Sequence, residues 1–344
     1  MRTFTFKGLF LTVLLGCLSI QAADADLITK QITIKLDEAG TLPNKIGNSR
    51  KYDITNLKLV GEINGTDLRM IREMAGRDHN GDVTKGNLSV LDLSEAKIVE
   101  GGGSYCSDYY TSNDKIGDVA FSGCSGLTSF TLPAGITRIG SYAFHGCSGL
   151  TSLNLPASIT EIGAGAFDEC SGLTSLNLPV GITSIGNYAF SGCSGLTSLN
   201  LPAGITEIGQ GAFQYCSGLT SITLHAGITE IGHGAFSGCS GLTSIYVYAE
   251  KVPEILSDAF KGCDAKKCTV YVPKGTYDDY WLSGFGYFEN IVEFDATGID
   301  KTTTSTDVEE VSRYSVNGQR LVGPTKGLNI VKYSDGSVKK VAVE

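Results

Sequence analysis

The feature that most constrains this chain is a repeat of 23 residues. Six cysteines stand at that interval without an insertion between them: Cys124, Cys147, Cys170, Cys193, Cys216 and Cys239. Seven phenylalanines follow the repeat as well: Phe121, Phe144, Phe167, Phe190, Phe213, Phe236 and Phe260. A period of this length is typical of proteins that stack one structural unit many times. We therefore expect an array of similar units in the middle of the chain.

One unit, residues 170–192, has the sequence CSGLTSLNLPVGITSIGNYAFSG. Its L-x-x-L-x-L spacing predicts a short strand that buries Leu176 and Leu178 and exposes Asn177 between them. Pro179 ends this strand, because proline cannot donate the next ladder hydrogen bond. A single unit cannot enclose its own apolar side chains, so neighbouring units must cover one another. The sequence predicts a β-rich right-handed coil with parallel strands and columns of Leu, Ile, Phe and Cys inside.

The repeat has the motif A-F-x-x-C-x-x-L-x-x-L-x-L-P-x-x-I-x-x-I-G, read here from Ala166 to Gly186. This motif resembles the 23-residue subtype of the BspA-like leucine-rich repeats of Bacteroidetes surface proteins. The resemblance covers residues 116–262 and implies a leucine-rich repeat solenoid. It also implies a cell-surface protein that mediates adhesion through contacts with other proteins.

Less regular sequence precedes the repeats. Diverged copies of the leucine spacing occur at residues 54–59 and 88–93, so we expect repeats over residues 88–262, with regular units at 124–238. Residues 26–87 are predicted to form a small α/β N-terminal cap with the first coil. Within it, the alternation of Ile32, Ile34 and Leu36 predicts a strand. Asp67 is predicted to cap a helix that runs to about Ala75.

The repeats need a closing element, because an uncovered solenoid end exposes a strand edge and apolar core. Residues 263–296 are predicted to form this C-terminal cap, with a final strand at residues 269–273. Residues 297–310 have the composition of a linker. Residues 311–344 predict a short β module, with hairpin signals at residues 317–318 and 335–336. This module resembles the C-terminal sorting domain of exported Bacteroidetes proteins; a plain β module is the alternative.

The first 25 residues have the pattern of an export signal. Arg2 and Lys7 precede an apolar stretch that is too short to span a bilayer as a helix. Two kinds of processing remain open. Signal peptidase could cleave near residue 23 or 26, or Cys17 could become a lipidated N-terminal residue, because residues 14–17 resemble a lipobox. Both place the mature protein outside the cytoplasm, extracellular or on the outer surface, and we expect no membrane insertion once the signal is removed.

Composition excludes several classes of function. The net charge of −9 disfavours nucleic acid, whose binding requires a surplus of Lys and Arg. The sequence contains no nucleophile elbow, phosphate-binding loop or dinucleotide fingerprint in a fitting context. Only four histidines are present, and no cysteine pair has the spacing and nearby histidines of a zinc site. We therefore predict no catalytic residue, no metal and no cofactor.

The cysteines are predicted to form a column of buried thiols, since stacked side chains that point the same way fit the disulfide dihedral poorly. Cys263 and Cys268 lie outside the regular spacing and are the candidate disulfide.

Binding is the remaining opportunity, because a solenoid presents a broad and rigid surface. The outward positions of successive strands are Thr131, Asn154, Asn177, Asn200, Thr223 and Tyr246. Tyrosines appear where the repeats differ, and tyrosine is common at protein-binding hot spots. The candidate ligand-binding residues are Tyr142, Tyr188, Tyr215, Tyr246 and Tyr248, together with Asn154, Asn177 and Asn200. For each tyrosine, the alternative is that the ring only shields a turn.

Three functions remain open at this stage. An extracellular protein, from a host or a neighbouring cell, is the first partner, with many weak polar contacts along one face. A glycan-binding module is the second, and several aromatic rings on one face would favour it. A passive structural surface protein without a specific ligand is the third.

Overall fold

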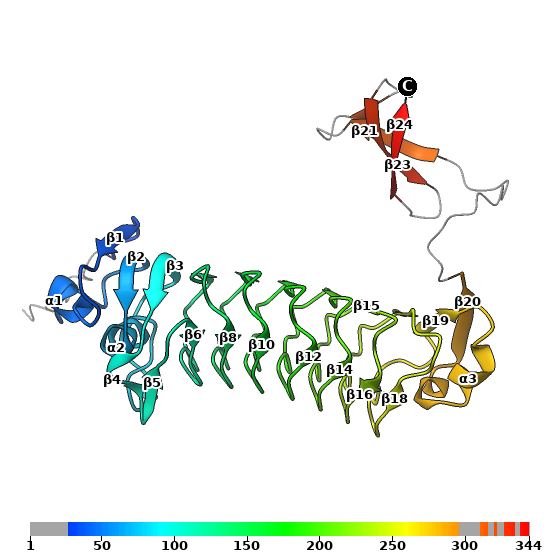
Figure 1. The fold of residues 1–344 in the computed structure, drawn as a ribbon, viewed down its shortest axis with the longest axis horizontal. Helices are drawn as coiled ribbons and strands as arrows, with labels where there is room; N and C mark the ends of the chain where they lie inside the picture. The colour runs from blue at the N-terminus through cyan, green and yellow to red at the C-terminus, as the bar shows by residue number, and fades with distance from the viewer. Residues whose placement is uncertain (1–26, 296–309, 316–319, 322–326, 334–337, 344) are drawn as a thin grey trace, which may run out of the picture. The chain divides into compact units, whose positions relative to one another are not determined.

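The structure, a computed structural model, describes residues 27–295 and four strands within residues 310–343 (Figure 1). The chain divides into two compact units at residues 296–297, each described by itself below. The export signal with Cys17 and the predicted linker, except for its last residue, lie outside the described residues. Within the described residues, no helix combines the length and the hydropathy needed to cross a membrane.

The first unit is a solenoid of parallel strands, as the repeat predicts. Its main sheet has eleven strands, in the order β1-β2-β3-β7-β9-β11-β13-β15-β17-β19-β20. The strands are β1 (Ile32–Lys35), β2 (Asn56–Ile63), β3 (Val90–Ile98), β7 (Ser129–Thr131), β9 (Ser152–Asn154), β11 (Ser175–Asn177), β13 (Ser198–Asn200), β15 (Ser221–Leu224), β17 (Ser244–Val247), β19 (Thr269–Pro273) and β20 (Asn290–Phe294). Each repeat pairs with its equivalent, so that Leu176 lies beside Leu153. The diverged leucine motifs form β2 and β3, and the predicted final strand is β19.

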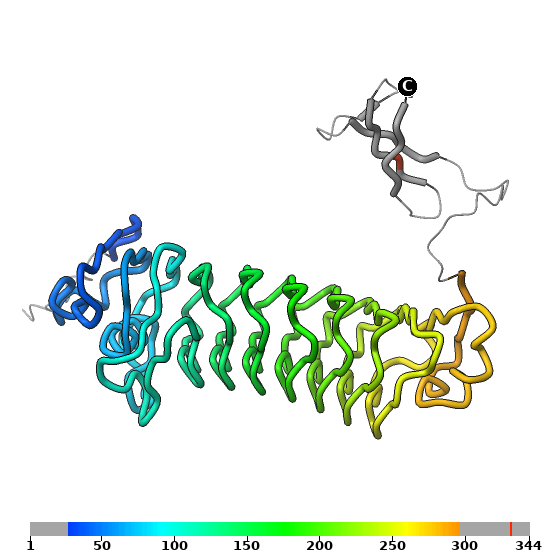
Figure 2. The backbone as a smooth tube through the Cα atoms, viewed as in Figure 1, coloured from blue at the N-terminus to red at the C-terminus, as the bar shows by residue number. Residues whose placement is uncertain are grey.

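In each repeat, a second strand of two residues comes after the main-sheet strand, and these short strands pair with one another. One sheet contains β6 (Lys115–Ile116), β8 (Arg138–Ile139) and β10 (Glu161–Ile162). The other contains β12 (Ser184–Ile185), β14 (Glu207–Ile208), β16 (Glu230–Ile231) and β18 (Glu254–Ile255). A turn containing the phenylalanine and the cysteine then leads back to the main sheet, and Figure 2 shows these turns side by side.

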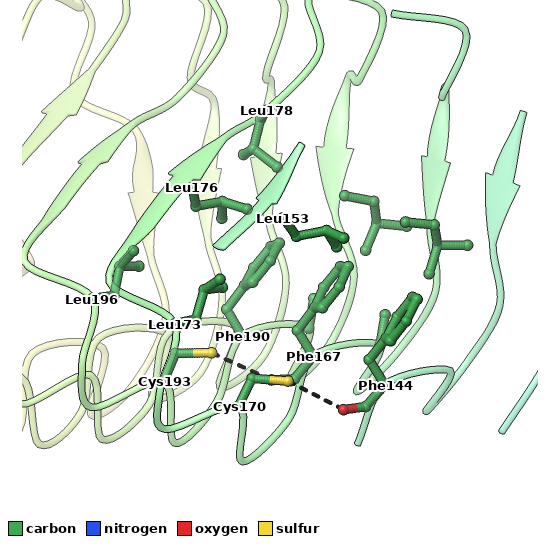
Figure 3. Packing of buried hydrophobic residues seen from close by; sticks show 14 of the residues in the cluster. Phe144, Leu153, Phe167, Cys170, Leu173, Leu176, Leu178, Phe190, Cys193 and Leu196 are labelled. Carbon is green, nitrogen blue, oxygen red and sulfur yellow. Dashed lines mark hydrogen bonds between the residues drawn. The ribbon is translucent and has the colours of Figure 1, made fainter. Parts of the chain in front are cut away.

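The core is a column of stacked side chains. The rings from Phe121 to Phe260 lie 5.3–5.7 Å apart between centroids, and successive ring planes differ by only 3–11°. Figure 3 shows Phe144, Phe167 and Phe190 in this column, beside the leucines of the main sheet. All seven rings are buried, which confirms the predicted inward column.

A second buried column is made by the cysteines. Six thiols donate to the carbonyl oxygen of the phenylalanine in the preceding turn, over Sγ–O distances of 3.1–3.4 Å. Figure 3 draws two of these bonds, from Cys170 to Phe144 and from Cys193 to Phe167. Burial raises the pKa of the Cys170 and Cys216 thiols to about 12. The predicted column of buried thiols is confirmed.

The prediction that Cys263 and Cys268 form a disulfide is wrong. Cys263 continues the cysteine column, because its thiol donates to the carbonyl of Phe236 over 3.4 Å. Cys268 lies just before β19, and both cysteines are free thiols in the structure. The one extra residue between Cys239 and Cys263 is absorbed before the phenylalanine, so Cys263 keeps the contact made by earlier cysteines.

The N-terminal cap contains α1 (Leu42–Ile46), α2 (Gly65–Met74), β4 (Gly101–Cys106) and β5 (Tyr109–Thr111). The N-cap of α2 is Asn64, rather than the predicted Asp67. Asp67 is the third residue of the helix, and its carboxylate completes a capping box by accepting from the Asn64 N–H over 2.9 Å. The same buried carboxylate accepts from Gly40 and Leu42, which ties α1 to α2.

The C-terminal cap contains α3 (Tyr277–Trp281), the 3-10 helix η1 (Gly284–Tyr287) and β20. Phe285 and Phe288 place their rings 5.3 and 5.2 Å from the ring of Phe260. The aromatic column is thereby covered at its last ring.

The second unit is an antiparallel sheet, in the order β22-β21-β23-β24. Its strands are β21 (Glu310–Ser315), β22 (Arg320–Leu321), β23 (Gly327–Tyr333) and β24 (Val338–Val343). The predicted hairpin turns at residues 317–318 and 335–336 lie outside the described residues. The strands on either side of each turn pair antiparallel, as a hairpin requires.

The cysteine column makes stability dependent on pH. The pKa of Cys216 is about 12 in the folded chain and 9.0 as its ordinary value. The unfolded chain therefore loses this proton first, so the stabilisation is complete below pH 9 and is lost as the pH rises towards 12. Above pH 9, we expect the free energy of unfolding to fall less steeply with pH in Cys216→Ala than in the unmodified chain. The difference in slope is up to about 1.4 kcal/mol per pH unit.

The measurement is urea unfolding at several pH values between 7 and 11. Thr183→Ala is the control, because Thr183 is exposed in the neighbouring turn and does not titrate in this range. If the free energy of unfolding has the same slope against pH in both variants, burial does not hold the Cys216 thiol neutral.

Candidate functional site

The outward residues of the main sheet form one continuous row. Thr131, Asn154, Asn177, Asn200, Thr223 and Tyr246 are register partners on successive strands. The three asparagines are exposed, and the row ends in larger side chains, since Tyr246 pairs with Tyr271 of β19. The rings of these two tyrosines stack at 4.6 Å, with an angle of 8° between their planes. Burial, with Tyr271 and Tyr248 nearby, raises the pKa of Tyr246.

Other aromatic side chains lie beside this pair. The ring of Tyr248 is 6.3 Å from His225 and 5.1 Å from Phe294 of β20, which meets it edge-on at 86°. We call Tyr246, Tyr248, Tyr271, Phe294 and His225 the aromatic platform. The sequence analysis did not identify Tyr271 or Phe294 as binding residues, because both lie in the cap. The alternation within residues 269–273 could have identified Tyr271, since it leaves that residue half-buried between the buried Val270 and Val272.

The candidate tyrosines Tyr142, Tyr188 and Tyr215 lie in turns with an unusual backbone. Their φ angles are +54°, +55° and +59°, in the left-handed region that favours glycine. Glycine occupies the equivalent position in most other turns, with the same sign of φ. A tyrosine in this conformation is strained, which is common at functional sites.

Each of these rings lies over a glycine of the next turn. A Cβ atom on Gly165 would be 2.4 Å from the Tyr142 ring, and one on Gly211 would be 2.4 Å from the Tyr188 ring. Gly238 has the same relation to Tyr215, at 2.5 Å. Glycine is therefore required after each tyrosine because the ring occupies the space of a side chain. One face of each ring shields a turn, and Tyr142 and Tyr215 still expose 42% and 60% of their surface.

Two of these tyrosines border a polar groove of about 480 Å³. It is lined by four glycines of the last turns: Gly211, Gly234, Gly238 and Gly262. The other lining residues include Tyr188, Tyr215, Gln210, Gln214, His233, Ser257, Asp258 and Lys261. We call this feature the turn groove. The groove exists because glycine has no side chain and leaves space beside the tyrosine and charged side chains of the adjacent turns.

The polar side chains of the turn groove are held by one another. Gln210 donates its amide N–H to the Tyr188 hydroxyl over 2.7 Å, and Lys261 lies 3.5 Å from the Asp258 carboxylate. The imidazole Nδ1 of His233 lies 2.7 Å from the Ser257 hydroxyl. Among the described residues, no acidic side chain contacts His233, so this pair lacks the orienting group of a catalytic triad. The groove offers hydrogen-bond donors and acceptors at fixed positions.

The structure brings together only part of the predicted set. Tyr188 and Tyr215 share the turn groove, whereas Tyr142 lies outside it and meets the ring of His145 edge-on at 5.9 Å. Tyr246 and Tyr248 belong to the aromatic platform on the sheet. Gln210, Asp258 and Lys261 were not predicted, because only the stacked turns place them near Tyr188 and Tyr215. Within residues 27–295 and the strands described beyond them, no three His, Cys, Asp or Glu side chains are grouped as metal ligands.

The fit between tyrosine and glycine can be measured. We expect Gly211→Ala to lower the free energy of unfolding by about 1–3 kcal/mol, because the new Cβ meets the Tyr188 ring and φ is +58°. In a Tyr188→Gly background the ring is absent, so the same substitution should cost about 1 kcal/mol less. Urea unfolding of the four proteins measures this coupling. Gly204→Ala is the control, because its Cβ would have ordinary contacts, and additivity at residues 188 and 211 would contradict the fit.

Comparisons with known proteins found a matching family and several similar solved structures. Residues 114–216 and 160–280 match the BspA type leucine rich repeat region, in six copies. No curated protein matches the chain. A leucine-rich repeat protein from Bacteroides ovatus is 31% identical over 48% of this chain, with a TM-score of 0.43, and this chain covers 45% of that protein. The leucine-rich repeat protein of T. pallidum is 28% identical over 50% of this chain and 78% of its own, with a TM-score of 0.40.

A leucine rich cell surface protein from Faecalibacterium prausnitzii is 20% identical over 77% of this chain and 88% of its own, with a TM-score of 0.29. The family match overlaps the residues 116–262 on which the sequence resemblance rests. Residues 114–280 are therefore similar to the BspA-type leucine-rich repeat family.

Proposed function

We propose that this chain is an exported, non-catalytic adhesion protein that binds another protein through the turn groove. The single observation that carries the proposal is that Tyr188 and Tyr215 line one polar groove together with four glycines. The match to BspA-type leucine-rich repeats supports a protein-binding role for the solenoid. The partner is an extracellular protein from a host or a neighbouring cell.

The rings of the groove suit protein recognition. Binding hot spots are enriched in tyrosine, which offers a large contact area together with a hydroxyl. Tyr188 and Tyr215 already rest on Gly211 and Gly238, so little side-chain freedom is lost when a partner contacts them. The surrounding amide, hydroxyl and ion-paired groups supply a polar rim.

Export is part of the proposal and rests on the pattern of residues 1–25. Both forms of processing stay open, with a mature chain that begins near residue 23 or 26, or at a lipidated Cys17. Mass spectrometry of the mature protein distinguishes them, because lipidation adds acyl mass to Cys17.

The turn groove is tested by replacing its tyrosines with glycine. Tyr188→Gly/Tyr215→Gly removes both rings and leaves the residue that left-handed backbone favours, so the fold is preserved. We expect the double variant to weaken binding to its protein ligand at least about 30-fold, equivalent to 2 kcal/mol or more. The assay measures the affinity of the purified mature chain for a panel of matrix and cell-surface proteins by biolayer interferometry.

The matched control is Tyr142→Gly, which makes the same change at a left-handed position outside the groove. Its affinity should equal that of the unmodified chain. Equal affinities for the control and the double variant would contradict the turn groove as the binding site. Absence of binding to every protein on the panel would favour the passive surface protein.

A second candidate function is glycan binding by the aromatic platform. The stacked pair of Tyr246 and Tyr271, with Tyr248 and Phe294 beside it, places several rings on one face. Sugar rings stack on such surfaces, and the neighbouring Asn200 and Thr223 can bind hydroxyl groups. On a glycan array, loss of binding in Tyr271→Ala but not in Tyr188→Gly would assign glycans to the platform. An unmodified chain that binds no glycan would exclude this candidate.

A further inference from the structure

The turns that contain the phenylalanines are joined by a regular ladder of backbone hydrogen bonds. In each turn, three alternate N–H groups donate to three carbonyl oxygens of the following turn. The N–H groups of Gly211, Phe213 and Tyr215, for example, donate to residues 233, 235 and 237 over 2.7–2.8 Å. Six successive turns make this set of three bonds, all with N–O distances of 2.7–3.1 Å.

The seventh turn has the same three donors and no acceptor for them. The N–H groups of Asp258, Phe260 and Gly262 bond to no acceptor within the described part of the chain. Their backbone repeats that of the turn before, since φ is +60° and +82° at Asp258 and Gly262 against +59° and +75° at the equivalent glycines. We call these three N–H groups the terminal donor row.

The C-terminal cap covers the core beside this row and leaves the row uncovered. Phe285 and Phe288 pack on the ring of Phe260, and the Tyr287 hydroxyl donates to the Cys263 carbonyl over 2.9 Å. A pocket of about 270 Å³ remains between η1 and the last turn. It is lined by residues 255–261 together with Gly284 and Tyr287, and it adjoins the turn groove through residues 257, 258 and 261.

At the opposite end of the ladder, cap side chains donate to two of the three first carbonyl oxygens. The Tyr105 hydroxyl donates to Asp118 over 2.7 Å, and Arg72 Nη1 donates to Ala120 over 2.7 Å. Arg72 is 1% exposed, so the chain buries a charged side chain to satisfy these oxygens. Three alternate N–H groups without an acceptor are thus found, among the described residues, at the C-terminal end of the ladder.

We infer that the terminal donor row binds a peptide segment of a partner protein, which takes up the conformation of a turn and adds to the ladder as its next rung. The inference rests on the proposed protein-binding function and names a second contact for the same partner, next to the turn groove. The six internal rungs show which ligand fits, because each presents carbonyl oxygens from alternate residues of a turn. The turn at residues 232–238 is wound, with hydrogen bonds from Ala235 N–H to Gly232 and from Ser237 N–H to Gly234, so a short glycine-containing peptide can copy it. A small anion fits less well, since the Asp258 carboxylate adjoins the row and a single carboxylate cannot span three alternate N–H groups.

The probe is an acetylated and amidated peptide, Gly-His-Gly-Ala-Ser-Ser-Gly. It copies residues 232–238, whose carbonyls fill the equivalent row of the turn two before the terminal one. Serine replaces the phenylalanine of that sequence, because Phe285 and Phe288 already cover Phe260. The peptide is titrated at millimolar concentration into the mature full chain, and amide shifts and hydrogen exchange are followed by NMR.

Without peptide, the Phe260 amide should exchange at least about 100-fold faster than the Phe236 amide, which is bonded within the ladder. With peptide, the amides of Asp258, Phe260 and Gly262 should shift, and their exchange should slow at least about tenfold. The equivalent amides of the preceding turn should stay unchanged. Equal protection of Phe260 and Phe236 in the free chain would show an occupied row and overturn the inference.

Asp258→Tyr tests the register of the bound peptide. At this position of earlier turns, Tyr142 and Tyr188 each require glycine at the facing position of the next turn. The variant should therefore favour the glycine peptide over Gly-His-Ala-Ala-Ser-Ser-Gly at least about tenfold more than the unmodified chain does. An unchanged preference would overturn the register.

Sodium acetate and sodium phosphate are titrated in parallel. If either salt shifts the amide signals of Asp258, Phe260 and Gly262 and the peptide does not, the row is an anion site and the inference is wrong. The inference is also wrong if neither the salts nor the peptide shift these signals. Tyr188→Gly/Tyr215→Gly leaves the terminal donor row in place. Loss of protein binding in that variant with intact peptide shifts supports the groove and the row separately, and each can fail without the other.

Discussion

Everything in the solenoid depends on one constraint: each side chain must pack against its own equivalent in the next turn. Phenylalanine meets this constraint by parallel stacking at 5.3–5.7 Å. Threonine meets it through its hydroxyl, since Thr151, Thr174 and Thr197 each donate to the carbonyl of the equivalent threonine one turn earlier. Cysteine meets it with a thiol small enough to be buried and able to donate to the preceding turn. The residues that recur in every turn are therefore those that can stack on, or donate a hydrogen bond to, the neighbouring turn at this spacing.

A structure built by self-stacking has a problem at its two ends, because each end leaves an equivalent turn missing. The N-terminal cap solves it with polar side chains: the Tyr105 hydroxyl and the buried Arg72 donate to the carbonyl oxygens of Asp118 and Ala120, which a preceding turn would otherwise cover. The C-terminal cap solves it with aromatic rings placed against Phe260. Side-chain donors can satisfy carbonyl oxygens, but rings cannot satisfy N–H groups. The two ends of one ladder consequently have different chemistry.

Function is expected where the repeat is broken, because identical turns offer the same polar surface everywhere. Tyr188 and Tyr215 depart from glycine at left-handed positions, and each is possible only because glycine follows in the next turn. That alternation creates the turn groove. On the main sheet, the aromatic platform begins where the small residues of the row give way to Tyr246 and Tyr271. Both features lie toward the C-terminal end of the repeats.

The sequence by itself determined the period, the inward columns and the strand positions, because each unit carries a local pattern that its neighbours repeat. Leu176 is buried and Asn177 is exposed because apolar and polar residues alternate along this short strand. Only the tertiary structure decided what lies one turn away: that Cys263 remains in the thiol column despite one extra residue, and that Asp67 joins two helices instead of beginning one. It also decided which tyrosines share a groove and which N–H groups find no acceptor. These are contacts between residues 20 to 30 positions apart, and their geometry depends on the exact path of each turn, which the pattern of apolar residues leaves undetermined.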